Sequence, residues 1–140
     1  MAPPFQVTEW KVGDLLAHDL SDGRSVFAIV VGHHVDDGGR CPVLAFLDWK
    51  ANEPPKEEDV RRLAVRELHL RGMSRPRSKF AAAQRTKRDR PLMHVIARNV
   101  ELPAQVRPKD MWTLFWWQDF RPDVVPLLMA RRSRGHLHEL

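Results

Sequence analysis

The amino-acid sequence predicts an α+β fold in which β-structure dominates, and two observations support this prediction. Three apolar segments of strand length stand between residues 10 and 50, and two turns that contain glycine separate them. Gly32, at the end of the second segment, can form a bulge at which that strand bends. Short strands bent in this way are typical of small barrels. We therefore expect a small, partly open SH3-like antiparallel β-barrel with one short helix and one long basic loop.

The first three predicted strands follow one another closely along the chain. Residues 14–20 alternate imperfectly between polar and apolar types, and the turn after them contains Gly23, which can adopt a positive φ. Residues 25–31 are nearly all apolar and many are β-branched, which is typical of a central strand buried on both faces. After a second turn at 36–39, residues 43–49 predict a third strand of the same kind.

A helix is predicted after these strands. Two adjacent prolines end the sheet region, and the acids that follow them favour the positive end of a helix dipole. Val60, Leu63 and Ala64 have the spacing of one apolar helix face. We expect a helix of about three turns that ends before His69. Residues 65–70 also alternate, so a short strand there is the alternative.

The second half of the chain has weaker patterns. Residues 71–90 show no sustained periodicity and predict a long exposed basic loop, in which the alanines after Phe80 could form one helical turn. Residues 92–100 predict another strand, and residues 111–120 are the most aromatic stretch. Residues 124–129 contain a proline and predict an edge strand or no element.

The length of 140 residues fits one domain. Because Pro3 and Pro4 oppose a helix, we expect residues 1–9 to form an extended N-terminal arm. Residues 10–130 then form a single β-rich domain that includes the basic loop. Residues 131–140 are expected to be a flexible C-terminal tail.

The positive charge of the chain is concentrated in one segment. Residues 71–90 contain eight basic residues and one acid, a charge of +7, so the rest of a chain whose net charge is +5 carries −2. Such a local charge favours nucleic acid less than a basic domain would. The single cysteine, the lack of a secretory signal pattern and the lack of a long apolar segment predict a cytoplasmic, bacterial-type protein with no membrane segment.

We expect no catalytic, cofactor-binding or metal-ligating residues, and hence no enzyme. The histidines lack zinc-site spacing, and the adjacent His33 and His34 point to opposite faces of a strand. Cys41 lies across a predicted turn from this pair, but a lone cysteine is most often a small buried hydrophobe. The carboxylates at 36–37 and 57–59 are explained by a turn and a helix start.

Two sets of residues remain as candidate partner-binding residues. The basic loop contributes Arg75, Arg77, Lys79, Arg85, Lys87 and Arg88. The aromatic stretch contributes Trp112, Trp116 and Trp117. The cations could bind phosphates, contact an acidic protein face or remain solvated. The tryptophans could stack on bases, but exposed tryptophan and arginine side chains more often anchor protein interfaces.

The opening of the domain resembles a known family. The sequence WKVGDLLAHDLSDGR at residues 10–24, followed by FAIV at 27–30, is similar to the start of the immunity protein 26 family. The similarity covers residues 10 to about 31 and continues loosely through the third strand. It implies a small β-rich domain, encoded beside a polymorphic bacterial toxin, that neutralises this toxin by direct binding. The alternative is a small nucleic-acid-binding barrel that uses the basic segment 71–90.

Overall fold

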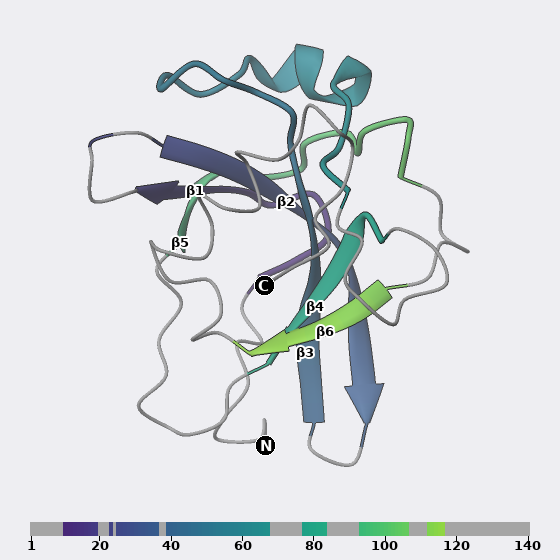
Figure 1. Ribbon diagram of the computed structural model, residues 1–140. Coiled ribbons are helices and arrows are strands. Elements are labelled where there is room, and N and C mark those ends of the chain that lie inside the picture. The colour runs from purple at the N-terminus through teal and green to yellow at the C-terminus, as the bar shows by residue number, and fades with distance from the viewer. Residues whose placement is uncertain are drawn as a thin grey trace.

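The computed structural model describes residues 10–19, 23, 25–36, 39–67, 77–83, 93–106 and 112–116. In chain order these contain β1 (Leu15–Asp19), β2 (Ser25–Asp36), β3 (Gly39–Phe46), a 3₁₀ helix η1 (Glu57–Arg62), β4 (Lys79–Ala83), β5 (Met93–Ala97) and β6 (Trp112–Trp116), as Figure 1 shows. The predicted β-rich fold is confirmed, and the described residues contain very little helix.

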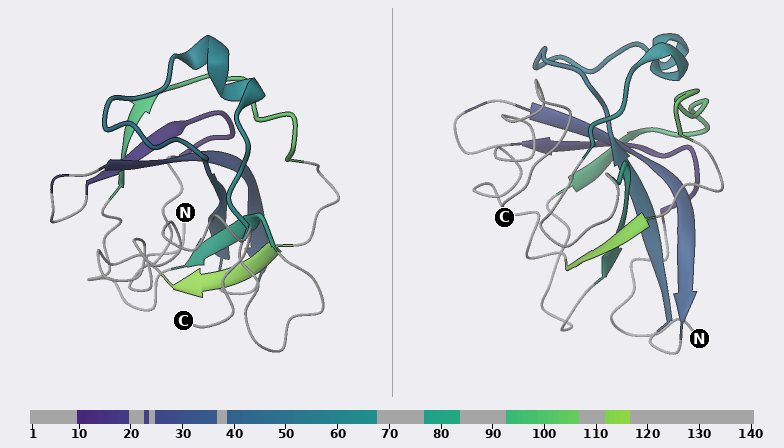
Figure 2. Two further views of the ribbon diagram at one scale, coloured as in Figure 1. Left: turned by 45° about the horizontal axis from the view of Figure 1, so that its top comes forward. Right: turned by 45° about the vertical axis from the view of Figure 1, so that its right-hand side comes forward.

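The strands form one six-stranded sheet in the order β5-β1-β2-β3-β4-β6. The five strands from β5 to β4 pair in antiparallel fashion, and β6 pairs with β4 in parallel. Within the described ranges β5 and β6 form the two edges and do not pair with each other, so the sheet is open there. Figure 2 shows that the long strand β2 runs from the β1 end of the sheet to its hairpin with β3.

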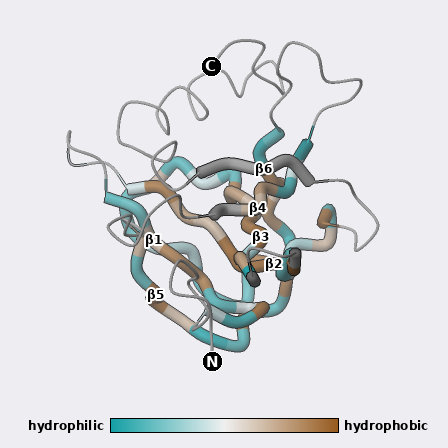
Figure 3. The backbone as a smooth tube through the Cα atoms, turned by 90° about the horizontal axis from the view of Figure 1, so that it is seen from below, coloured by the Kyte–Doolittle hydropathy of each residue, from teal (hydrophilic) through white to brown (hydrophobic). Residues whose placement is uncertain are grey.

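The core lies against the central strands. Ile29 of β2 and Leu44 of β3 are fully buried, as the apolar pattern of both segments predicts. One face of the sheet packs a cluster that includes Phe27, Ala45 and Val60, the buried residue of η1. In Figure 3 the hydrophobic stretches follow β1, β2 and β3 through the middle of the molecule.

The predicted bulge near Gly32 is confirmed. The register between β2 and β3 shifts between Val30 and Gly32. Beyond the bulge the two strands continue as a hairpin until Asp36 pairs with Gly39, so the predicted second turn is tighter than 36–39. The strand is therefore longer than the sequence pattern suggested, because polar residues after the bulge still pair through their backbones.

The predicted three-turn helix is wrong. Its place is taken by the 3₁₀ helix η1, which ends where the Leu63 N–H donates to the Val60 carbonyl. The chain then returns to β3: Val65 forms an isolated bridge with Leu47, and the Arg66 N–H donates to the Phe46 carbonyl. Three-residue spacing fits a 3₁₀ helix as well as an α-helix, and pairing with β3 then ends the helix. Val65 agrees with the alternative prediction of a strand at 65–70, of which residues 68–70 lie outside the described residues.

The segment predicted as a basic loop contains a strand. The alanines that could have formed one helical turn belong to β4, which pairs with β3 and β6. Phe80 of β4 is buried and its ring lies 5.9 Å from that of Phe46. Tertiary pairing has therefore overridden the helix propensity of alanine. The fourth predicted strand also shortens to Met93–Ala97.

Several sequence predictions lie outside the described residues. They include the N-terminal arm 1–9, the strand at 124–129 and the C-terminal tail 131–140. The boundaries of the single domain therefore stay predictions. In the parts of the chain that the structure describes, no helix is long and apolar enough to cross a bilayer.

Gly13 and Gly23 both have positive φ, at 92° and 87°. A Cβ at Gly13 would lie 3.2 Å from the Val100 carbonyl oxygen, whereas a Cβ at Gly23 would have no neighbour within 4 Å. We expect Gly23→Ala to lower the free energy of unfolding by about 1 kcal/mol and Gly13→Ala by about 3 kcal/mol. Urea unfolding measures both values. Equal losses would show that the close approach of Val100 contributes nothing.

Candidate functional site

The parallel pairing of β4 with β6 brings the basic segment and the aromatic stretch together. In this register Lys79 pairs with Trp112, and Ala83 pairs with Trp116. The two segments are about thirty residues apart in sequence, and no sequence pattern indicated that they pair. We call this part of the sheet, formed by β4, β6 and the preceding Arg77, the β4–β6 edge.

The predicted partner-binding residues have different positions relative to this edge. Arg77 is half-buried two residues before the start of β4. Lys79 is only 7% exposed, so Lys79 cannot contact a partner without moving. Trp112 and Trp116 occupy the first and last positions of β6. The remaining candidates lie outside the described residues: Arg75, Arg85, Lys87, Arg88 and Trp117.

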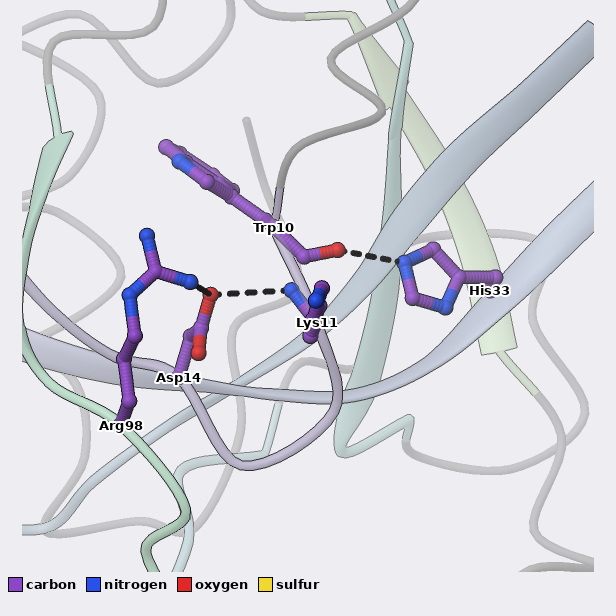
Figure 4. A network of polar contacts seen from close by, with 5 residues as sticks. All are labelled: Trp10, Lys11, Asp14, His33 and Arg98. Carbon is purple, nitrogen blue, oxygen red and sulfur yellow. Dashed lines mark hydrogen bonds and ion pairs between the residues drawn. The ribbon is translucent and has the colours of Figure 1, made fainter.

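A polar network that the sequence analysis missed surrounds the turn before β1. The carboxylate of Asp14 is buried, and its Oδ2 accepts hydrogen bonds from the Lys11 backbone N–H at 2.9 Å and from Arg98 Nη1 at 3.1 Å. Figure 4 shows both contacts. A buried carboxylate needs such partners, because an unpaired charge would be costly to remove from water. Asp14 therefore fixes the turn and ties it to the chain after β5.

His33 connects this turn to the β2–β3 hairpin. Its Nε2 lies 2.8 Å from the Trp10 carbonyl oxygen, and its Nδ1 lies 3.0 Å from Arg40 Nη2. Because arginine can only donate, Nδ1 must accept and Nε2 must carry the proton. The two contacts thus require the neutral imidazole in a single tautomer. Figure 4 shows the bond to Trp10.

The environment of His33 also favours the neutral form. Burial lowers the pKa of His33 below its ordinary value of 6.5. The hydrogen bond to the Trp10 carbonyl raises this pKa, the charge of Arg40 lowers it, and the charge of Asp14 raises it, with the net effect downward. Desolvation is the largest of these effects because a charged imidazole loses more hydration than a neutral one.

Val35 is the most exposed large hydrophobic residue of the hairpin, at 69%. It pairs with Arg40 across the two strands, two pairs beyond His33 and Pro42. Residues two apart on a strand share a face, so His33, Val35 and Arg40 lie together. We define the hairpin face as these three residues and Lys11, the exposed residue that follows Trp10, whose carbonyl oxygen contacts His33.

The hairpin face had only a partial signal in the sequence. The prediction that His33 and His34 point to opposite faces agrees with the register, in which His34 pairs with Cys41. Cys41 is buried beside Val43 and packs as a small hydrophobe. The sequence analysis did not predict that Val35 and Arg40 pair, because polar residues near the turn made both strands look shorter than they are.

A second buried ion pair has a structural role. Arg66 Nη2 lies 3.5 Å from Asp48 Oδ1, and both side chains are largely buried. Burial lowers the pKa of Arg66 to about 10, so the guanidinium stays charged at neutral pH. The pair joins the end of β3 to the segment after η1. Where the structure describes the chain, no three His, Cys, Asp or Glu residues gather as a metal site.

We expect Asp14→Ala to lower the free energy of unfolding by about 2–3 kcal/mol, since two hydrogen bonds to a buried charge are lost. Asp19→Ala is the matched control, because Asp19 is exposed and bonds only the Ser25 hydroxyl among the described contacts. The control is expected to change stability by about 0.5 kcal/mol or less. Urea unfolding of both variants decides whether Asp14 holds the turn; similar small losses would contradict this role.

His33 is expected to make the fold less stable in acid. Its pKa is lowered in the folded state, so its contribution to stability is complete above the unfolded value of about 6.5 and is lost as the pH falls through the folded value. His33→Gln can keep a donor and an acceptor without titrating. Urea unfolding at about pH 7.5 and about pH 5 should therefore show a smaller loss for His33→Gln than for the wild type. His94→Gln, at an exposed position of β5, should behave as the wild type does.

Together, the β4–β6 edge and the hairpin face contain cations, an exposed apolar side chain and a sheet edge. Protein-binding surfaces commonly combine such features. The chain was compared with protein-family models, with curated proteins and with solved structures. None of these comparisons finds a match. The β4–β6 edge and the hairpin face are therefore the features of this fold that bear on function.

Proposed function

We propose that this chain is a non-catalytic protein-binding domain that resembles a bacterial toxin-immunity protein and neutralises a toxin by direct binding. Its rigid part is the open β-sheet, which we interpret as a partly open SH3-like barrel. Its expected location is the cytoplasm, and its partner is the toxin encoded beside it.

The pairing of β4 with β6 is the observation that carries this proposal. Two segments that were predicted separately as partner-binding meet at one sheet edge, where Trp112 begins β6 beside the start of β4, two residues after Arg77. Tryptophan and arginine are the residues most enriched among the energetically dominant contacts of protein interfaces. Their convergence on one edge therefore supports a binding surface more strongly than either segment alone.

The central strands supply the rigidity that such a surface needs. β2 is paired on both sides and its residues from Val26 to Val30 are buried. β4 is fixed to this frame through β3, with Val43 opposite Ala81 and Leu44 opposite Phe80. A surface that is ordered before binding loses less conformational entropy on association.

The burial of Lys79 counts against the alternative that the basic segment binds nucleic acid. A cation that neutralises a phosphate has to reach the nucleic-acid backbone. Lys79 lies inside the protein, and the other cations assigned to this role, except Arg77, lie outside the described residues. The alternative is retained as an outcome of the test below.

The test is co-expression of this chain with the protein encoded by the adjacent gene. We expect the two proteins to co-elute in size-exclusion chromatography. Arg77→Glu should weaken the complex about tenfold, because a charge reversal at the edge opposes the partner. Arg62→Glu, an exposed charge reversal at the end of η1, is the matched control and should change the affinity by less than about twofold.

Two results would contradict the proposal. One is the absence of a complex with the adjacent gene product when both proteins are folded. The other is binding to single-stranded or double-stranded nucleic-acid probes whose affinity falls steeply with salt, since counterion release identifies phosphate contacts. The second result would favour the nucleic-acid-binding barrel.

A further inference from the structure

We propose that the hairpin face, formed by Lys11, His33, Val35 and Arg40, binds an acidic protein surface. In this complex Arg40 pairs with a carboxylate of the partner, and Val35 packs against an apolar group beside it. This inference rests on the proposed function, because it gives the proposed partner a second contact besides the β4–β6 edge and specifies the chemistry of that contact.

Arg40 is positioned before any partner arrives. Its Nη2 donates to His33 Nδ1 at 3.0 Å, and His33 is itself held by the Trp10 carbonyl at 2.8 Å. A guanidinium has five N–H donors, so this contact leaves donors that can form a two-point bond with a carboxylate. An arginine whose rotamer is already fixed loses less side-chain entropy on binding.

The chain of contacts behind Arg40 reaches the interior. Trp10 belongs to the turn that Asp14 fixes through Lys11 and Arg98. Gly13 in the same turn donates its N–H to the Val30 carbonyl and accepts from the Val100 N–H, both at 2.9 Å. Arg40 is therefore connected to three separate parts of the sheet, whereas a surface arginine normally has free rotamers.

Among the described side chains around this face, the exposed charges are positive. Lys11 and Arg40 are exposed, and the side chain of Arg98 is 54% exposed. The acid among them, Asp14, has a side chain only 2% exposed and is already bonded to Arg98. A partner with carboxylates at its surface is thus complementary in charge, which speeds the encounter and disfavours basic partners.

Val35 favours a protein over a nucleic acid as the partner. It projects from a strand at 69% exposure and shares its face with Arg40. A single exposed valine is ordinary on a protein surface. Next to a preorganised arginine, however, it adds apolar area beside a charged group, a combination that protein interfaces use. Phosphates would gain nothing from it.

Acid should weaken this binding. Protonation of His33 replaces the acceptor at Nδ1 with a second N–H that faces Arg40 and repels its charge. The groups that face His33 are Arg40 from β3, and the Trp10 carbonyl and Asp14 from the turn before β1. The carbonyl and Asp14 attract the protonated ring, so His33 would stay in place while Arg40 is released.

The experiment is titration calorimetry of the complex with the adjacent gene product, at about pH 7.5 and about pH 5.5. We expect Val35→Asp and Arg40→Glu to weaken binding about tenfold or more at the higher pH. Arg40→Lys keeps the charge but not the planar fork, so its loss should be smaller. The matched controls, Ile96→Asp on β5 and Arg62→Glu on η1, should change the affinity by less than about twofold.

The comparison of affinities at the two pH values tests the role of His33. Wild-type affinity should fall between the two pH values, and His33→Gln should remove most of that fall. Circular dichroism of each variant confirms the fold; should Val35→Asp unfold, Val35→Thr keeps the branched shape and should weaken binding less but in the same direction.

The outcomes separate this inference from the proposed function. A complex that forms but is unaffected by Val35→Asp and Arg40→Glu overturns the inference and leaves the proposed function standing. Failure of the wild type to bind the adjacent gene product overturns both. Salt-sensitive binding of nucleic-acid probes that Arg40→Glu abolishes would assign the face to phosphates, and it also overturns the inference.

Discussion

Strand β2 is hydrogen-bonded along both sides, to β1 over its first half and to β3 over its second, and the rest of the molecule depends on this pairing. The bulge between Val30 and Gly32 bends β2 between the part that pairs with β1 and the part that forms the hairpin with β3. An extra residue of this kind bends a strand and increases its twist. A straight strand of the same length would extend the β1 half and the hairpin in one plane. The bend instead turns the hairpin out of the plane of the β1 half, and β4 and β6 lie beside β3 (Figure 2).

The turn before β1 joins parts of the sheet that are distant in sequence. Gly13 and Asp14 exchange backbone hydrogen bonds with Val30 on one side, and Gly13 accepts one from Val100 on the other. The buried carboxylate of Asp14 then satisfies the Lys11 N–H and balances Arg98. Backbone groups that would otherwise be buried without partners are thereby paired, which is the condition for an irregular segment inside a fold.

The β4–β6 edge and the hairpin face differ in the contacts that hold them in place. The β4–β6 edge depends on strand pairing, so its residues are placed by the backbone. The hairpin face depends on side chains, because the imidazole of His33 contacts both Arg40 and the Trp10 carbonyl in the turn before β1. Both are attached to a buried central sheet, and rigid sheets that carry variable surfaces are a common solution for recognition.

Local sequence pattern is enough to specify the central meander. The apolar runs of β2 and β3, the positive φ of Gly23 and the bulge near Gly32 follow from local pattern and turn chemistry, and all were predicted. Tertiary structure decided the rest. The alanines of β4 have helical propensity, yet pairing with β3 and β6 makes them a strand. The short apolar spacing around Val60 fits two kinds of helix, and the return of Val65 to β3 selects the shorter one.

The candidate sites divide in the same way. Composition identified the cations and tryptophans as a set, but their meeting at the β4–β6 edge is a parallel pairing between distant segments, which no local pattern encodes. The hairpin face was missed because its members come from the turn before β1 and from both strands of the hairpin, where hydrogen-bond geometry selects one tautomer of His33. Local sequence fixes which residues can form strands and turns, whereas contacts between distant segments decide which side chains share a surface, because they depend on how the whole sheet pairs.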